Sequence, residues 1–306
     1  MQPQHAHDTL AATHHPWVTD ALVDWCEANF HVVWFVAEFW NTVSNLWIVA
    51  FGILGMLYCR WYSYEPRFTV AYFSIVLVGV GSSLFHGSLT YHMQLLDELP
   101  MLFGTAAMIY CCLTPHRAFP PLWATIIVVA YPIVSTAIYL ANRNAEFFQI
   151  AYTLQVVFIT ALTARNGRVF TDPAPTASKT ALRISAKAGP ALRWQGLAAY
   201  GFGTALWVVD NVYCYSHLVP LKEAVGSPWA VLLELHAWWH ALTGYGSFCS
   251  LTYMVAVRMQ ARADEGAVKD RDVALLWWGP LVPYVVWGED ARRAVVEKGG
   301  KKAKSE

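Results

Sequence analysis

The stretch Thr69–Leu89, TVAYFSIVLVGVGSSLFHGSL, runs through twenty-one residues without one Asp, Glu, Lys or Arg. An α-helix needs about 20 predominantly apolar residues to cross the hydrocarbon layer of a membrane. The whole chain agrees with this interpretation, because 56% of its 306 residues are hydrophobic and only 14% are charged. Soluble proteins carry about 25% charged residues. We therefore expect an integral membrane protein built from helices.

Similar apolar stretches recur along the chain, and together they predict an all-α membrane protein with a bundle of seven transmembrane helices. The expected spans are 37–58, 69–89, 95–115, 121–140, 146–164, 195–215 and 232–257. This bundle occupies residues 24–257, between a mobile polar N-terminus (1–23) and a tail (258–306). The apolar segment 273–287 of the tail is too short to span, so we expect it in the membrane interface or packed against the bundle.

Basic residues are distributed unevenly between the two sides of this bundle. If the N-terminus is outside, every Lys and Arg except Arg143 and Lys222 falls on the inner side. Positively charged segments remain preferentially in the cytosol. We therefore expect a luminal N-terminus and a cytosolic C-terminus.

This orientation places two of the six cysteines, Cys26 and Cys214, on the oxidising side of the membrane. Disulfides form and persist in such compartments. We predict a bridge between these two residues, with two free buried thiols as the open alternative.

Three histidines lie at membrane depth. His236 and His240, in the run ELHAWWHALTGYG, are four residues apart and project from one face of a helix. His86 ends the span 69–89 and reaches the same luminal depth in the predicted topology. Three protein ligands and one open position make a catalytic zinc site, and ionisable groups at this depth are functional candidates. The alternative is that these histidines only hydrogen-bond between helices.

An acid and a hydroxyl are expected beside the histidines. Asp97 lies near the start of the third span, and Ser82 is one helical turn before His86. These residues predict metal-assisted hydrolysis, in which Asp97 is the acid/base and Ser82 stabilises the oxyanion. Two alternatives stay open: Asp97 could be a helix-start acid, and Ser82 a small residue that allows close packing. Glu98 is expected to be a helix-start acid.

Three carboxylates and one amide gather before and at the start of the first span, with no basic residue nearby. They are Asp24, Glu27, Asn29 and Glu38. Oxygen ligands of this kind suit a hard cation such as calcium. The segment lacks the glycine and spacing of an EF-hand loop, so a helix cap with solvated acids remains the alternative.

Taken together, these motifs resemble the alkaline ceramidases, which are seven-helix membrane amidohydrolases of the same superfamily as the adiponectin receptors. The resemblance covers about residues 24–257 and is carried by DWCEANF, AEFWNTVSN, SLFH, QLLDELPM and WWHALTGYGS. It implies cleavage of the amide of a membrane lipid, a ceramide, dihydroceramide or phytoceramide, to a sphingoid base and a free fatty acid.

The resemblance also implies roles for individual residues. It implies zinc bound by His86, His236 and His240, with Ser82, Asp97 and Ser247 beside the metal. It implies calcium bound by Asp24, Glu27, Asn29 and Glu38, together with the backbone carbonyl of Trp25. It supports the Cys26–Cys214 bridge and residence in the endoplasmic reticulum or Golgi membrane. The last residues, with Lys302 and Lys304, are similar to a K-x-K-x-x retrieval signal, although an ordinary basic tail is the alternative.

Two other functional classes remain open. A receptor of the adiponectin-receptor type would use the same fold and zinc site, with ligand binding as its main role. A transporter would be expected to carry inverted repeats and broken central helices, and no convincing repeat is found in this sequence. No nucleic-acid partner is expected, and protein partners are left open.

Overall fold

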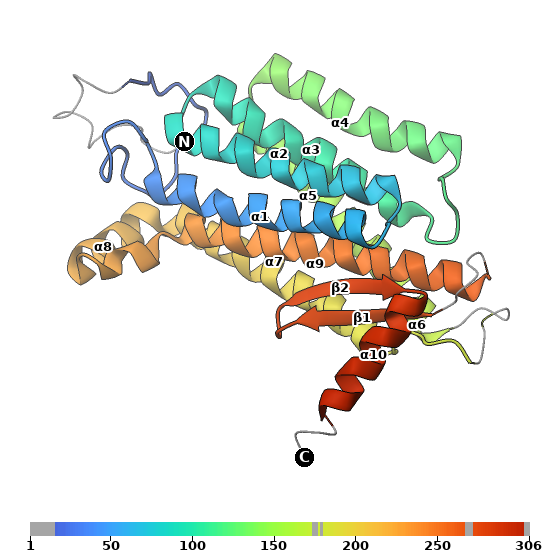
Figure 1. Cartoon of the computed structure of the whole chain (residues 1–306). Coiled ribbons are helices and arrows are strands. Elements are labelled where there is room, and N and C mark those ends of the chain that lie inside the picture. The colour runs from blue at the N-terminus through green and yellow to red at the C-terminus, as the bar shows by residue number, and fades with distance from the viewer. Residues whose placement is uncertain (1–15, 173–176, 178–179, 267–271, 303–306) are drawn as a thin grey trace.

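A computed structural model describes residues 16–172, 177, 180–266 and 272–302. Long helices in this part of the chain alternate in direction and pack side by side (Figure 1). They are α1 (Phe39–Trp61), α2 (Pro66–Ser88), α3 (Tyr91–Leu113), α4 (Leu122–Asn142), α5 (Ala145–Asn166), α7 (Ala188–Tyr213) and α9 (Leu235–Asp264). The alternation brings the end of α2 and the starts of α1, α3 and α9 to one end of the bundle. We call it the histidine end.

Short elements complete the fold. They are α6 (Arg168–Thr171), the π-helical turn η2 (Cys214–Leu218), α8 (Val219–Val225), the 3₁₀ turn η3 (Trp229–Leu233), β1 (Val273–Trp278), β2 (Val282–Trp287) and α10 (Glu289–Lys302). The strands β1 and β2 pair in an antiparallel hairpin that packs along α9 (Figure 1). The fold is therefore mostly helical rather than purely helical. The apolar segment of the tail packs against the bundle, as expected, but as a hairpin that the sequence analysis did not predict.

Within the described residues, five helical segments are long and apolar enough to cross a membrane. They are α1, α2, α3, α4 and the segment Ala145–Thr171, which joins α5 to α6. The helices α7 and α9 have 26 and 30 residues but are not in this set. Both bury polar side chains such as Asp210 and His240, and such residues lower the hydropathy of a helix. The protein is a helical membrane protein, while the seven spans and the orientation stay predictions.

The helix ends differ from the expected ones by several residues. The largest differences are at α7, which begins at Ala188 instead of 195, and at α9, which ends at Asp264 instead of 257. The extra turns of α9 contain charged residues that a hydropathy pattern rejects. Within the fold they are buried and paired, because Arg258 contacts Glu65 at 2.8 Å and Asp264 pairs with Arg183. Residues 1–15 of the predicted mobile N-terminus and 303–306 of the K-x-K-x-x pattern lie outside the described residues.

A glycine brings α2 and α3 into backbone contact at the histidine end. A Cβ atom on Gly81 would lie 1.9 Å from the carbonyl oxygen of Leu96. Small residues allow such close approach between helices in membranes. The next residue of each helix is a candidate catalytic residue, Ser82 on α2 and Asp97 on α3. The close crossing therefore determines how near these two side chains lie.

We expect Gly81→Ala to destabilise the bundle, because the added methyl group would meet backbone atoms that cannot rotate away. Overpacking of this kind costs about 1–3 kcal/mol, and thermal unfolding of the purified protein in detergent would measure it. The matched control is Gly201→Ala on α7, where a Cβ atom meets nothing within 4 Å. Equal melting temperatures for the two variants would contradict the proposed tight crossing.

Candidate active site

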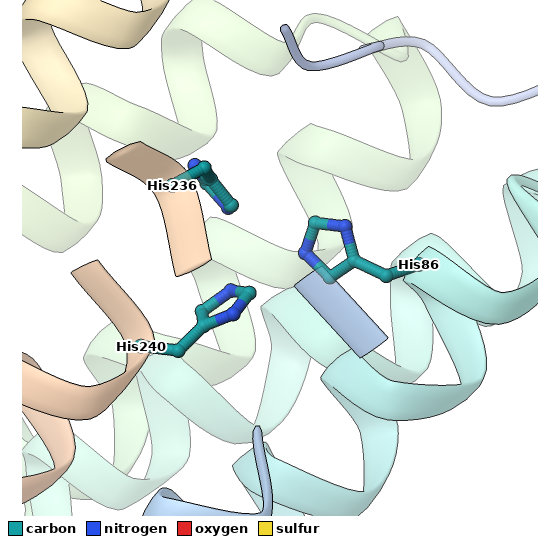
Figure 2. A group of neighbouring side chains, drawn as sticks. All are labelled: His86, His236 and His240. Atoms are coloured by element: carbon teal, nitrogen blue, oxygen red, sulfur yellow. The ribbon is translucent and has the colours of Figure 1, made fainter. Parts of the chain in front are cut away.

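Three buried histidines converge at the histidine end, and Figure 2 shows their rings pointing toward one another. His86 comes from the last turn of α2, and His236 and His240 come from the first two turns of α9. Their ring centroids are 4.7–5.1 Å apart. One potential ligand atom from each ring lies within 4.8 Å of the other two, and no other His, Cys, Asp or Glu group in the described residues is as tight.

Hydrogen bonds to the rings of His86 and His240 leave one nitrogen of each ring for a ligand. Nδ1 of His86 lies 2.5 Å from a carboxylate oxygen of Glu38, and Nδ1 of His240 lies 2.8 Å from the hydroxyl of Ser44. The remaining nitrogen of each ring is Nε2. Nδ1 of His236 is buried and has no hydrogen-bond partner. Buried polar atoms are nearly always paired, so an orphan nitrogen within this cluster fits a missing metal ion.

The segment 20–29, which we call the strap, lies across the histidine end. The backbone N–H of Ala21 donates to the carbonyl of Leu89 at 3.1 Å, and that of Leu22 donates to the side chain of Gln94 at 2.7 Å. The side chain of Asp20 accepts from the N–H of Tyr91 at 2.7 Å. These bonds attach the strap to the end of α2 and the start of α3.

Trp25 of the strap stacks on one of the three histidines. Its ring centroid lies 4.0 Å from that of His236, with 23° between the ring planes. The strap therefore fixes the orientation of this imidazole from outside the helical bundle. The sequence analysis considered Trp25 only for its backbone carbonyl, because nothing in the sequence indicates that these two rings meet.

Asp97, Ser82 and Ser247 line one cavity together with His236 and His240. The cavity has a volume of about 240 Å³, and the Ser82 hydroxyl lies close to the Asp97 carboxylate within it. Most other lining residues are apolar, among them Ile75, Met101, Met108, Phe148, Val156 and Trp239. Asp97 and the two serines thus share a mostly apolar chamber with Glu98 and with two of the histidines.

The helix-start interpretation of the two acids on α3 is wrong. The helix begins at Tyr91, so Asp97 and Glu98 lie in its second turn and its first turn holds no acid. Glu98 instead accepts hydrogen bonds from Gln94, at 2.9 Å, and from the hydroxyl of Tyr139 on α4. A hydrophobicity pattern did not locate this start because the first turn contains polar residues.

The acidic group lies directly beside the histidines. Glu38 accepts from the N–H of Trp25 at 3.1 Å and from Asn41 at 3.0 Å, as well as contacting His86. Glu27 accepts from the N–H groups of Trp40 and Asn41, at 2.7 and 2.8 Å, and so caps α1. This cap was the alternative considered from the sequence. Glu38 nevertheless contacts both the acidic group and, through His86, the three histidines.

Electrostatics in the acidic group favour a cation. Burial raises the pKa of Glu27 to about 7. Burial and then the charge of Asp24 raise the pKa of Glu38 well above its usual value. The side chain of Asn29 lies 3.3 Å from that of Asp24, and its Oδ1 is buried without a partner. Repelling carboxylates and an orphan oxygen fit the oxygen ligands of a calcium ion.

The predicted disulfide is present in the structure. Cys26 and Cys214 are bonded, with Cα atoms 5.4 Å apart and a sequence separation of 188. Cys59, Cys111, Cys112 and Cys249 are free and buried. The bridge ties the strap to the end of α7. The N–H of Cys26 also donates to Asp210 at 3.3 Å.

Comparison with known proteins supports one family. The family described as Ceramidase matches residues 18–286. Alkaline ceramidase 3 of Mus musculus is 34% identical over 242 residues, which cover 78% of this chain and 85% of that protein. An alkaline ceramidase of Saccharomyces cerevisiae is 28% identical over 290 residues, covering 88% and 85%. One from Arabidopsis thaliana is 26% identical over 267 residues, covering 86% and 89%.

The chain belongs to the alkaline ceramidase family. The resemblance found in the sequence motifs is thereby confirmed, and the chain is a hydrolase of the ceramidase class. The match extends beyond residue 257 and includes the β-hairpin.

Several residues of this ceramidase site were missed by sequence reasoning. Ser44 holds His240, Trp25 stacks on His236, and the buried carboxylate of Asp210 accepts from the N–H group of Cys26. The one available signal was Asp210 itself, because an acid within an apolar helix is a functional candidate by default.

We expect the disulfide to stabilise the ceramidase fold by restraining the strap. Cys26→Ser, Cys214→Ser and the double variant should melt at the same lowered temperature, because each breaks the same bond. The loss expected for a native disulfide is about 2–5 kcal/mol, and thermal unfolding measures it. The double variant is the control, since independent residues give additive losses and coupled ones do not. Additive losses would contradict this expectation.

Proposed function

We propose that this ceramidase hydrolyses the amide bond of ceramides within the membrane, using a zinc ion held by His86, His236 and His240. One observation supports the proposal most directly. Three buried histidines lie together, one of them has a ring nitrogen without a hydrogen-bond partner, and two of them share a cavity with Asp97 and Ser82 inside an apolar bundle. The relatives' names, alkaline ceramidases, support ceramide as the substrate.

The donor set fits zinc in its catalytic form. Three neutral imidazoles are a known catalytic ligand set, and they leave one coordination position open. Glu38 accepts a hydrogen bond from Nδ1 of His86, which orients Nε2 of that ring toward the cluster and increases its basicity. A bound zinc ion supplies a Lewis acid for the amide carbonyl and lowers the pKa of water to about 7.

Asp97 is placed to move the proton during hydrolysis. Its carboxylate takes a proton from the attacking water as oxygen adds to the amide carbon. It then returns that proton to the amide nitrogen as the carbon–nitrogen bond breaks. The products are the amine of a sphingoid base and a free fatty acid. Ser82 lies close to Asp97, and both residues line the cavity.

The hydroxyls of Ser82 and Ser247 face the cavity from α2 and α9. A hydroxyl aimed at the carbonyl oxygen donates to the negative charge that develops there in the transition state. We assign this role to Ser82 and give Ser247 a supporting contact. The apolar lining of the cavity accommodates the hydrocarbon tails of a ceramide and excludes bulk water.

The first test measures zinc per chain and ceramide turnover in the same preparations. We expect about one zinc and activity in the wild type, and loss of both in His240→Ala. The matched control is His92→Ala, because His92 is exposed and lies outside the cluster. Zinc without turnover on any ceramide or phytoceramide would favour the receptor hypothesis, and a wild type without zinc would end the proposed mechanism.

Asp97→Asn separates proton transfer from metal binding. This variant keeps the size of the side chain and the contact with Ser82, so we expect it to retain zinc. General acid–base catalysis contributes about 10²–10⁴-fold, and kcat should fall by a factor in that range. Steady-state kinetics with a ceramide substrate measure it. Full turnover by zinc-loaded Asp97→Asn would rule out the assigned role.

We also propose that Asp24, Glu27, Asn29, Glu38 and the carbonyl of Trp25 bind calcium. A cation there would offset the repulsion among the carboxylates and hold the strap against α1. The connection through Glu38 to His86 would link this ion to the zinc ligands. We further propose that the chain crosses the membrane seven times, with the histidine end on the luminal side. We also propose that it resides in the endoplasmic reticulum or Golgi membrane.

Calcium binding should appear as thermal stabilisation, because a ligand that binds only the folded state raises its free energy of unfolding. We expect the melting temperature of zinc-loaded wild type to rise with free calcium. Asp24→Asn, which removes one charge of the cluster, should need more calcium for the same rise. Glu223→Gln on α8, an exposed acid outside the cluster, should follow the wild type. Identical calcium dependence in all three proteins would count against this site.

A further inference from the structure

We propose that residues Val273–Trp287 form a re-entrant β-hairpin. It enters the bilayer from the end of the bundle opposite the histidines, turns near the middle of the hydrocarbon layer, and returns. The exposed surface of its turn would be covered by lipid acyl chains. The proposal concerns a part of the molecule that the active site does not use, so it stands apart from the proposed catalytic mechanism.

The composition of this segment suits a membrane interior. The residues of β1, VALLWW, and of β2, VPYVVW, contain no charge, and neither does the turn between them. Charged residues begin at once on both sides, with Asp272 and Glu289. A hairpin that returns to the side it came from does not need the about 20 residues that a spanning helix requires.

Contacts with α1 and α9 place the two ends of the hairpin at different depths. At its base, the indole of Trp287 donates to the carbonyl of Tyr62, one residue past the end of α1, at 2.8 Å. At its turn, the carbonyl of Leu281 accepts from the hydroxyl of Tyr245 at 2.6 Å. The ring of Tyr245 lies beside Phe51 of α1, with centroids 5.4 Å apart. The turn is therefore level with the neighbourhood of Phe51.

The depth of the turn follows from the helix rise. Phe51 precedes the last residue of α1, Trp61, by ten residues, which is about 15 Å along the helix axis. Because the hydrocarbon layer is about 30 Å thick, the turn lies near its middle. Six strand residues cover about 20 Å, which is enough to reach this depth. In Figure 1 the turn likewise lies beside the middle of the helices.

The outer edge of β2 and the turn of the hairpin have hydrogen-bond partners within the protein. Unpaired N–H and C=O groups at a strand edge are costly where water is absent. On the outer edge of β2, Pro283 has no N–H, and the hydroxyl of Tyr64 both accepts from Val285 N–H, at 3.1 Å, and donates to its carbonyl, at 2.5 Å. At the turn, Gln195 also donates to Leu281 and to Tyr245. These bonds allow this edge and the turn to lie where water is absent.

The outer face of the turn is apolar and continuous with the lipid-facing surface of the bundle. Trp278 and Leu281 are 52% and 59% exposed. On α1, a helix apolar enough to span a membrane, the neighbouring exposed residue is Trp47, whose ring stacks on Phe51 at 6.3 Å. Acyl chains that cover Trp47 at this depth would reach the turn as well. This continuity favours lipid over a second protein as the occupant.

The test measures what surrounds the turn. A nitroxide is attached at Leu281→Cys in the full-length protein in lipid nanodiscs, and its power saturation is compared in oxygen and in a water-soluble nickel chelate. Oxygen concentrates in the bilayer interior, whereas the nickel chelate stays in water. We expect strong relaxation by oxygen and loss of relaxation by nickel. The matched control is Arg293→Cys on α10, where the native side chain is 72% exposed, and there nickel should dominate.

Any other pattern of relaxation would overturn the proposal. Relaxation by nickel at Leu281→Cys would place the turn in water. Protection from both reagents would mean that protein, such as a second copy of the chain, covers the turn. Trp278→Cys repeats the measurement if the first variant fails to fold, and the unsubstituted protein gives the background from the four buried free cysteines. Zinc content plays no part in this readout, so the result is independent of the active-site proposal.

Discussion

The hydrogen bond between Glu38 and His86 is the interaction on which the histidine end depends. Both side chains are almost fully buried, at 0% and 1% exposure, so neither can exchange its partner for water. Glu38 also receives the N–H of Trp25 and precedes the first residue of α1. One carboxylate therefore connects the strap, the start of α1 and a candidate metal ligand. Any cation bound by the acids would act on His86 through this contact.

Buried polar side chains also explain why α7 and α9 are less apolar than the other long helices. The helices α7 and α9 carry Asp210, His236 and His240, and each of these side chains is buried in the bundle. Such residues are tolerated within apolar surroundings when they face the protein interior and find partners. The hydropathy measure that identifies α1 to α4 thus fails on α7 and α9, although α9 supplies two of the three histidines.

Sequence periodicity and topology predicted the convergence of the histidines, because alternation of helix direction puts the end of α2 beside the start of α9. The same reasoning located the disulfide. It could not place Asp97 within α3, since the polar first turn concealed the helix start at Tyr91. Sequence patterns also could not predict the contacts of Ser44 and Trp25 with the histidines. Both contacts depend on how separate segments of the chain pack together, and a local sequence pattern does not predict this packing.

The hairpin escaped prediction for a different reason. A short apolar run with β-branched and aromatic residues is compatible with a strand or with a buried helical segment, and periodicity cannot separate the two. Pro283 could have resolved the ambiguity, because proline in a strand is confined to edges. What makes the strand possible is the hydroxyl of Tyr64, more than two hundred residues earlier in the chain. At both ends of the bundle, then, a buried polar group determines the local structure through a partner that is distant in sequence. At the histidine end Nδ1 of His236 has no such partner, and the three histidines there can bind a metal ion.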